Sequence, residues 1–188
     1  MKLSGSYQIN LEKQKVWEAL NNPEILKKSI PGCEEFVKKS ETEFTATATN
    51  KIGPFNATFT GDIELKDLDP PNSYKIIGSG NSPVGFANGE ASVTLEDFED
   101  GTNLKYSVEA NVGGKIAQVG SRLIDMTAKK MADIFFGKFV ELITTKTTTE
   151  KIKKVNEDKI QSQKKPINKI FVVLPALIII GIILYYLN

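Results

Sequence analysis

The sequence predicts an α+β domain in which a curved antiparallel sheet surrounds one long helix, followed by a single C-terminal transmembrane helix. Apolar and polar residues alternate over residues 55–65 and again over 104–112, as in strands with one buried face. Residues 115–143 lack proline and repeat apolar residues at helical spacing. Residues 170–187 form an uncharged apolar run of 18 residues, long enough to cross a bilayer.

The N-terminal part begins with a loosely alternating strand over residues 2–10. A short helix is expected over 12–20, where Trp17 and Leu20 recur at helical spacing and are interpreted as core residues. Pro23 stands where a second helix begins, and that helix is expected to end before Pro31.

Short strands separated by turns follow. Besides the two alternating segments, strands are expected to begin at residue 74 and to span 90–98, with turns at 69–72 and 99–101. Such an order favours an antiparallel sheet. The glycine-rich segment 78–89 lacks the ending of a phosphate-binding loop, so we interpret it as strand bulges and a hairpin end.

The expected long helix, residues 115–143, has one face directed at the sheet. On a helical wheel this face carries Ala117, Gly120, Ile124, Ala128, Met131, Phe135 and Leu142. Its small residues indicate either close approach of helix and sheet or a cavity between them, and both interpretations stay open. Val119, Arg122 and Met126 project away from this face and are candidate contacts to a partner protein. Packing at the helix end is the alternative for Val119 and Met126, and a solvated side chain or, less favoured, a contact in the pocket is the alternative for Arg122.

The C-terminal tail is predicted to be a membrane anchor on a tether. Residues 144–169 carry eight lysines against three acidic residues, which favours a basic tether, flexible over much of its length, although part of it can continue the preceding helix. The tether either attracts anionic lipid or is simply a solvated spacer. Lys169 precedes the apolar run 170–187, and two tyrosines close it. Because positive flanks stay in the cytoplasm, we expect a single-pass cell-membrane protein whose N-terminal domain, residues 1–143, is cytoplasmic.

Composition excludes several classes of function. A formal net charge of +1 gives no reason to expect nucleic-acid binding. The chain has no histidine, which removes the commonest general base and the commonest transition-metal ligand. Cys33 is the one cysteine, so neither an internal disulfide nor a zinc, haem or iron–sulfur site is expected. We interpret it as a half-buried small hydrophobe.

Four segments carry a family resemblance: residues 17–23 (WEALNNP), 30–33 (IPGC), 53–55 (GPF) and 113–124 (GGKIAQVGSRLI). Together they resemble the carbon monoxide dehydrogenase G-subunit family of the START-like (SRPBCC) helix-grip superfamily, over roughly residues 2–143. The resemblance implies a helix-grip fold and a membrane-associated accessory protein without catalytic residues. It also implies recruitment of a carbon monoxide dehydrogenase-like molybdenum hydroxylase to the membrane and handling of a lipophilic electron acceptor such as a quinone.

We therefore expect a quinone, or another isoprenoid or acyl lipid, to bind without a covalent link between sheet and helix. The candidate lining residues are Phe55, Phe59, Tyr106, Ala117, Gly120, Ile124, Ala128, Met131 and Phe135. Two alternatives stay open: a general lipid carrier without a redox partner, and, less favoured, a cyclase- or hydratase-type enzyme. Such an enzyme would require a buried acid–base pair, and the predicted inner faces show no paired carboxylates.

Overall fold

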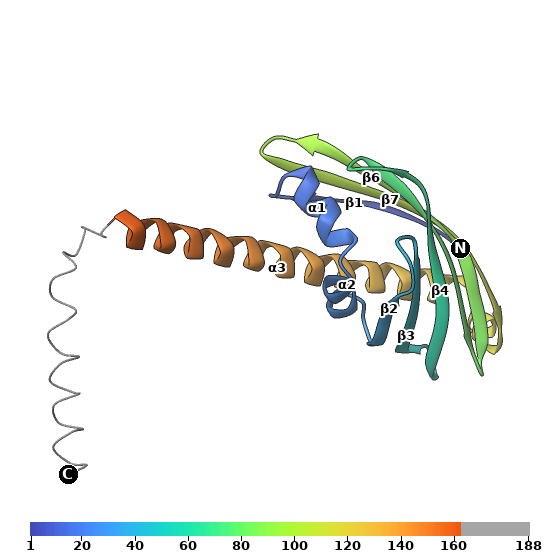
Figure 1. The fold of residues 1–188 in the computed structure, drawn as a ribbon. Coiled ribbons are helices and arrows are strands. Elements are labelled where there is room, and N and C mark those ends of the chain that lie inside the picture. Colours follow the sequence, from blue (N-terminus) through green and yellow to red (C-terminus); the bar gives the residue numbers. More distant parts are fainter. Residues whose placement is uncertain (163–188) are drawn as a thin grey trace, which may run out of the picture. The chain divides into compact units, whose positions relative to one another are not determined.

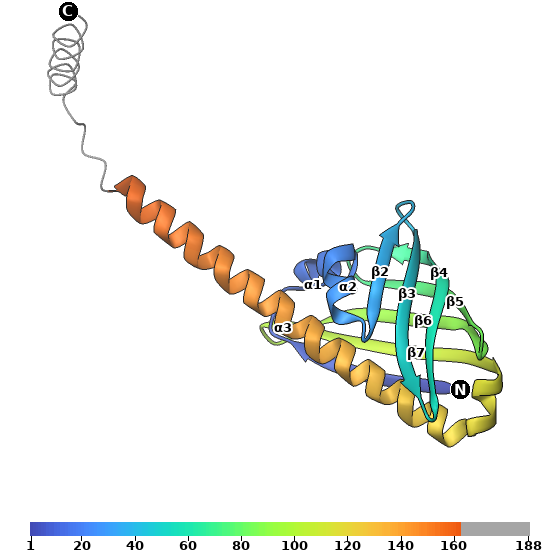
Figure 2. The same cartoon turned by 90° about the horizontal axis from the view of Figure 1, so that it is seen from below.

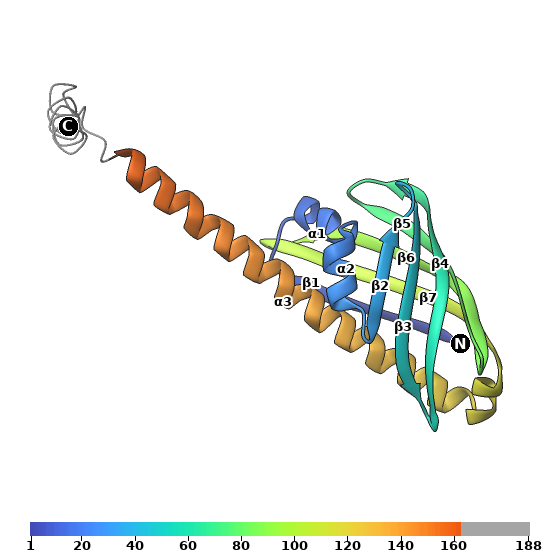
Figure 3. The same cartoon turned by 60° about the horizontal axis from the view of Figure 1, so that its bottom comes forward.

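Within the described residues, 1–162, seven antiparallel strands form one curved sheet in the computed structural model, in the order β1-β7-β6-β5-β4-β3-β2 (Figure 1). The strands are β1 (Lys2–Ile9), β2 (Cys33–Lys38), β3 (Glu43–Ile52), β4 (Phe55–Asp69), β5 (Ser73–Ser82), β6 (Gly85–Phe98) and β7 (Gly101–Gly114). Strands β2 to β7 pair in sequence order, and β1 pairs with β7 at the other edge (Figure 3). The predicted antiparallel sheet is confirmed.

Four helical elements complete the described part of the chain: α1 (Lys13–Leu20), α2 (Pro23–Ser29), the 3-10 helix η1 (Lys115–Val119) and α3 (Ser121–Ser162). The chain divides into two compact units, Met1–Thr147 and Thr148–Asn188. In the first unit, α1, α2 and the beginning of α3 lie on the concave side of the sheet (Figures 1 and 2). This arrangement is the predicted one, a curved sheet closed by a C-terminal helix.

The two short helices are where the sequence predicts them. Pro23 opens α2, and the Asn22 side-chain oxygen accepts hydrogen bonds from the backbone N–H groups of Glu24 (3.0 Å) and Ile25 (3.2 Å). This cap satisfies donors that the first turn leaves unpaired. Trp17 of α1 is buried and contacts the Tyr74 ring edge-on, with 5.3 Å between the ring centroids. The prediction that it is a core residue is confirmed.

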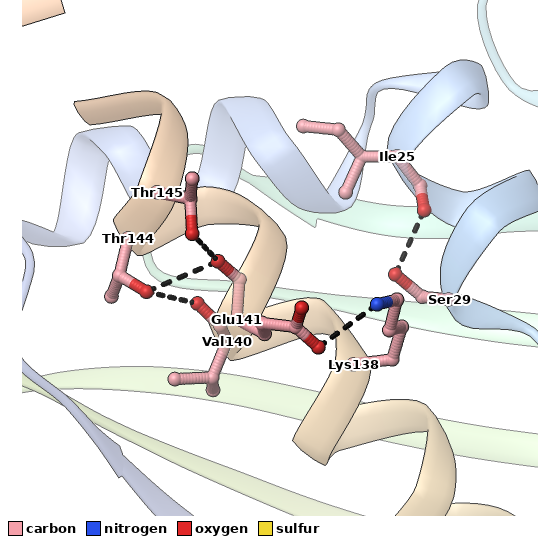
Figure 4. A network of polar contacts seen from close by, with 7 residues as sticks. All are labelled: Ile25, Ser29, Lys138, Val140, Glu141, Thr144 and Thr145. Carbon is pink, nitrogen blue, oxygen red and sulfur yellow. Dashed lines mark hydrogen bonds and ion pairs between the residues drawn. The ribbon is translucent and has the colours of Figure 1, made fainter. Parts of the chain in front are cut away.

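Several hydroxyl groups on the helices donate to a carbonyl of their own helix. Ser29, which is only 2% exposed, donates to the Ile25 carbonyl at 2.8 Å (Figure 4). Thr144 of α3 donates to the Val140 carbonyl at 2.7 Å (Figure 4). These bonds let polar side chains occupy the helices without leaving a buried hydroxyl unpaired.

The long helix does not begin at residue 115, as the sequence analysis expects. Residues 115–119 form η1, and Gly120 follows with a φ of 88°. An α-helical residue has a φ near −63°, so Gly120 interrupts the helix and α3 starts at Ser121. The interruption resets the helical phase. Over residues 121–145, the part of α3 whose side chains are described, the most buried residues are Phe136, Phe139 and Ile143.

At its other end α3 continues through Ser162, so residues 144–162 of the expected tether are helical. Within residues 1–162, no helix combines the length and the apolar character needed to cross a membrane. The predicted anchor, residues 170–187, lies outside the described residues.

A candidate apolar ligand cavity

A cavity of about 480 Å³ lies on the inner side of the sheet. Its walls come from all seven strands of the first unit, from α1 and α2, and from α3. Pockets for small organic ligands have volumes of roughly 300–1,000 Å³, so this space is large enough for a lipophilic molecule.

The strand register explains why the sheet side of the cavity is hollow. One row of directly paired inner residues crosses five strands: Leu65, Ile76, Ala91, Val108 and Leu3. All five line the cavity. Ala91, on β6, is the middle residue of this row and has its smallest side chain. Space therefore opens above the middle of the row, with larger residues on either side.

On the helix side, the cavity is bounded by one stripe of α3. The lining residues are Ala128, Met131, Ala132, Phe135 and Phe136. Two alanines in successive turns leave room beneath the helix, while the aromatic residues in the next turn close the space. Of the two interpretations that the small residues left open, a cavity is the one found for Ala128.

The structure brings together some of the predicted lining residues and leaves others apart. Those that line the cavity are Tyr106, Ala128, Met131 and Phe135. Those outside the lining are Phe55, Phe59, Ala117, Gly120 and Ile124. The interruption at Gly120 separates Ala117 and Gly120 from the helix that carries the stripe. Ile124 does belong to α3, but it lies one turn before Ala128, where the lining begins.

Phe55 and Phe59 lie on the predicted face of β4, but nearer to the beginning of the strand than the residues that line the cavity. Both alternate with exposed residues and share the face of the lining residues Ile63 and Leu65. They pair with Ile52 and Ala48 of β3, toward the turn at Gly53. The alternation in the sequence therefore identifies the face correctly but not the position along the strand.

Sequence reasoning missed the contributions of α2, β2 and β3. From these elements and the segments that flank them, the lining includes Leu26, Ile30, Phe36, Phe44 and Asn50. Phe36 and Phe44 also contact each other, with ring centroids 5.4 Å apart. A signal is present, because apolar residues alternate with threonines over residues 44–49, as in a half-buried strand.

The cavity lining is almost entirely apolar. Among the described residues that line it, none has a charged side chain, and the polar ones are Asn50, Tyr74 and Tyr106. The Asn50 amide already donates to the Pro31 carbonyl at 3.1 Å. Burial raises the pKa of Tyr74 above its usual value, because ionisation would place a charge in these apolar surroundings. An apolar, uncharged ligand fits such a lining, because a charged group would lose its hydration without a partner.

Tyr106 belongs to an aromatic cluster between the sheet and α3. Its ring centroid is 5.2 Å from that of Phe136 and 6.2 Å from that of Tyr7. The Tyr7 hydroxyl donates to Asp133 Oδ1 at 2.7 Å. Burial is the main cause that raises the pKa of Tyr106, and the negative charge of Asp133 adds to it, while the neighbouring hydroxyl of Tyr7 acts in the opposite direction.

A second, more open hollow of about 1,000 Å³ includes polar residues of the outer sheet face. Its charged residues are Lys2, Lys39, Glu43, Asp62, Glu64, Glu90 and Glu109. Lys2 pairs with Glu109 at 2.7 Å, and Lys39 pairs with Asp62 at 3.1 Å. These are exposed ion pairs of the kind found on any solvated surface.

The predicted partner-facing residues differ in exposure. Arg122 is exposed, and Met126 is 61% exposed. Val119 is half-buried instead, and its side chain stands beside Gly53 in the β3–β4 turn. For Val119, the structure supports the alternative of packing at the helix end.

The described residues contain no cluster of three or more His, Cys, Asp or Glu side chains that could hold a metal ion. Cys33 is half-buried, and its thiol donates to the Glu35 carbonyl at 3.3 Å. Burial raises the pKa of this thiol, which disfavours the reactive thiolate form.

Solved structures of other proteins share this fold. A conserved protein from Geobacillus kaustophilus is 32% identical, with 77% of this chain and 96% of that chain covered and a TM-score of 0.74. Protein Ms6760 from Mycobacterium smegmatis is 17% identical over 77% and 92% of the two chains, with a TM-score of 0.59. Zhui aromatase/cyclase from Streptomyces sp. R1128 is 11% identical over 78% and 95%, with a TM-score of 0.55. The last two comparisons concern the fold alone.

No curated protein matches the chain. A family model does match, the one for the G subunit of carbon monoxide dehydrogenase (CoxG), and it covers residues 5–144. This span holds β2 to β7, α1, α2 and the part of α3 that lines the cavity. The resemblance seen in the sequence is confirmed: the chain belongs to the carbon monoxide dehydrogenase G-subunit family.

Proposed function

We propose that this protein binds a neutral lipophilic molecule, a quinone or another isoprenoid or acyl lipid, in the cavity between the sheet and α3. The observation that carries the proposal is the apolar lining without charged side chains among the described residues. Burial of apolar surface contributes roughly 25 cal/mol per Å², so such a cavity binds an apolar molecule mainly by removing it from water. No covalent bond is needed.

Membership of an accessory-subunit family supports a role beside an enzyme rather than as one. We propose that the protein recruits a carbon monoxide dehydrogenase-like molybdenum hydroxylase to the membrane and presents the lipophilic molecule to it as an electron acceptor. The apolar run at residues 170–187 supports attachment to the cell membrane, with the domain on the cytoplasmic side. Arg122 and Met126 are the candidate contacts to the enzyme.

The ligand can be identified by organic extraction of the full-length chain purified from native membranes, followed by mass spectrometry. We expect one class of neutral lipid at close to one molecule per chain. The variant Ala128→Trp, which fills the cavity from the α3 side, is expected to yield far less of it. Protein that is always empty and binds no added decylubiquinone would contradict the proposal.

Co-purification in mild detergent tests the partner. A molybdenum hydroxylase that copurifies with the wild-type chain and is lost from an Arg122→Glu/Met126→Glu variant would support the adaptor role. A lipid-loaded protein without any enzyme partner would instead identify a general lipid carrier. Conversion of the extracted lipid by the purified chain alone would identify a cyclase-type enzyme, although no carboxylate lines the cavity among the described residues.

A further inference from the structure

Three polar side chains meet where β1, β7 and α3 come together. Tyr7 of β1 donates to Asp133 of α3 at 2.7 Å, and the ring of Tyr106 of β7 lies nearly parallel to that of Tyr7. Of the three, only Tyr106 lines the cavity. The stacked rings of Tyr106 and Tyr7 therefore lie between the apolar cavity and the exposed carboxylate of Asp133.

The position of the Tyr106 ring is tightly defined. Tyr106 pairs across the strands with Gly5, and a Cβ at Gly5 would lie 2.7 Å from the Tyr106 hydroxyl oxygen. The ring thus extends over β1, into space that the side chain of any residue other than glycine at position 5 would occupy. Phe136 contacts both tyrosines, with ring centroids 4.3 Å from Tyr7 and 5.2 Å from Tyr106. Such preorganisation lowers the entropy that a hydrogen bond to a ligand costs.

Hydrogen-bond capacity then distinguishes the two tyrosines. The hydroxyl proton of Tyr7 is committed to Asp133, so Tyr7 can offer only its oxygen as an acceptor. Tyr106 lines the cavity, and among the described residues its hydroxyl donates no hydrogen bond of acceptable distance and angle, so its proton is available to a ligand. Asp133 and the absence of charged lining side chains in the described residues disfavour an anionic ligand group at this place. Met1 also lines the cavity, and its terminal ammonium group donates to the Ala110 carbonyl at 2.9 Å.

We propose that the Tyr106 hydroxyl donates a hydrogen bond to a neutral acceptor oxygen of the ligand, a carbonyl at one end of an apolar body. Tyr7 and Asp133 are positioning residues that hold the Tyr106 ring and leave its proton for the ligand. The inference rests on the proposed function, because it assigns the polar contact within the same cavity. It also assigns selectivity: a carbonyl-bearing lipid is bound in preference to its hydrocarbon analogue and to a fatty-acid carboxylate.

The test compares decylubiquinone with decylbenzene, which lacks carbonyl groups, on the full-length chain in mild detergent. Trp17 is the chain's one tryptophan and contacts the lining residue Tyr74, so quenching of its fluorescence by decylubiquinone reports binding. Decylbenzene and laurate are measured by competition. A neutral hydrogen bond contributes about 0.5–1.5 kcal/mol, so Tyr106→Phe should weaken decylubiquinone binding roughly 2- to 12-fold. Binding of decylbenzene should not change.

Matched variants separate this role from a structural one. Tyr74→Phe removes the other lining hydroxyl and should lower the ratio of the two affinities by a smaller factor than Tyr106→Phe does. Tyr7→Phe and Asp133→Asn should lower that ratio by a smaller factor than Tyr106→Phe does. In infrared difference spectra, the carbonyl band of bound decylubiquinone should lie at lower frequency in the wild type than in Tyr106→Phe, because hydrogen bonding weakens the C=O bond.

Each outcome decides between the proposals. If both probes bind but Tyr106→Phe changes neither affinity, or both equally, the assignment of Tyr106 is overturned while the proposed function stands. If the selectivity is lost in Tyr74→Phe instead, the polar contact lies at Tyr74. If the folded wild-type chain binds neither probe, the proposed function itself fails, and the assignment of Tyr106 fails with it.

Discussion

The ring of Tyr106 lies directly over Gly5, its partner across the β1–β7 pair. A Cβ built at Gly5 would stand 2.7 Å from the Tyr106 hydroxyl oxygen and 2.8 Å from Cε1. The two residues therefore form one unit: the glycine provides the space, and the tyrosine fills it with a ring that also lines the cavity.

The first prediction follows from this pair. Gly5→Ala should displace the Tyr106 ring, lower the free energy of unfolding by about 1–3 kcal/mol as overpacking does, and weaken ligand binding. Gly78→Ala is the matched control, because a Cβ there meets nothing within 4 Å. Denaturant titration of both variants measures the effect. Equal stability of Gly5→Ala and the wild type would show that the ring moves without cost.

The second prediction concerns the anchoring of α3. Phe139 is 0% exposed and stacks on Phe135 at 5.9 Å, whereas Ile134 on the same helix is 46% exposed. Phe139→Ala should lower the free energy of unfolding by about 3–5 kcal/mol. Ile134→Ala should change it by roughly 0.5 kcal/mol or less. If the denaturation curves of both variants shift by the same amount, the burial of Phe139 is contradicted.

Much of the fold could be predicted because its strands have one buried face and one face exposed to solvent. The alternation at residues 55–65 and 104–112 corresponds to β4 and β7, and Pro23 opens α2. Strand β3 is harder to recognise. Its inner residues after Phe44 are Ala46 and Ala48, which contrast little with the threonines between them.

The site could be predicted only in part because its boundary depends on long-range geometry. Periodicity identifies Tyr106, Ala128, Met131 and Phe135, but a helical wheel that starts at residue 115 wrongly includes Ala117 and Gly120, which precede the first residue of α3, Ser121. Small residues alone could not separate close approach from a cavity. The rings of Phe136 and Tyr7, 4.3 Å apart, lie between helix and sheet, and no local pattern encodes that contact.

The third prediction is that bulk inside the cavity, and not elsewhere on α3, blocks binding. Ala128→Trp places an indole among the lining residues and should reduce the affinity for decylubiquinone at least tenfold, since the cavity is only about 480 Å³. Met126→Trp, two residues earlier at a position that is 61% exposed, is the matched control and should bind normally. Equilibrium dialysis of the two variants decides. Equal affinities would place the ligand outside this cavity.

The fourth prediction concerns stability at alkaline pH. Tyr74 is 5% exposed, and burial raises its pKa above the usual value of 10.0. Above about pH 10 the unfolded chain therefore releases a proton that the folded chain still holds, so the free energy of unfolding falls as pH rises. The slope from this group is about 1.4 kcal/mol per pH unit. It continues until pH reaches the pKa of Tyr74 in the folded protein.

Tyr74→Phe removes this contribution and leaves every lysine in place, so the difference between the two proteins isolates the tyrosine. The stability of the wild type should fall more steeply than that of Tyr74→Phe between about pH 10 and pH 11.5, while the difference between them stays constant below about pH 9. Denaturant titrations at intervals of half a pH unit measure both curves. Parallel curves over the whole range would mean that the Tyr74 hydroxyl reaches water and ionises in the folded state, and hence that the cavity beside it is hydrated.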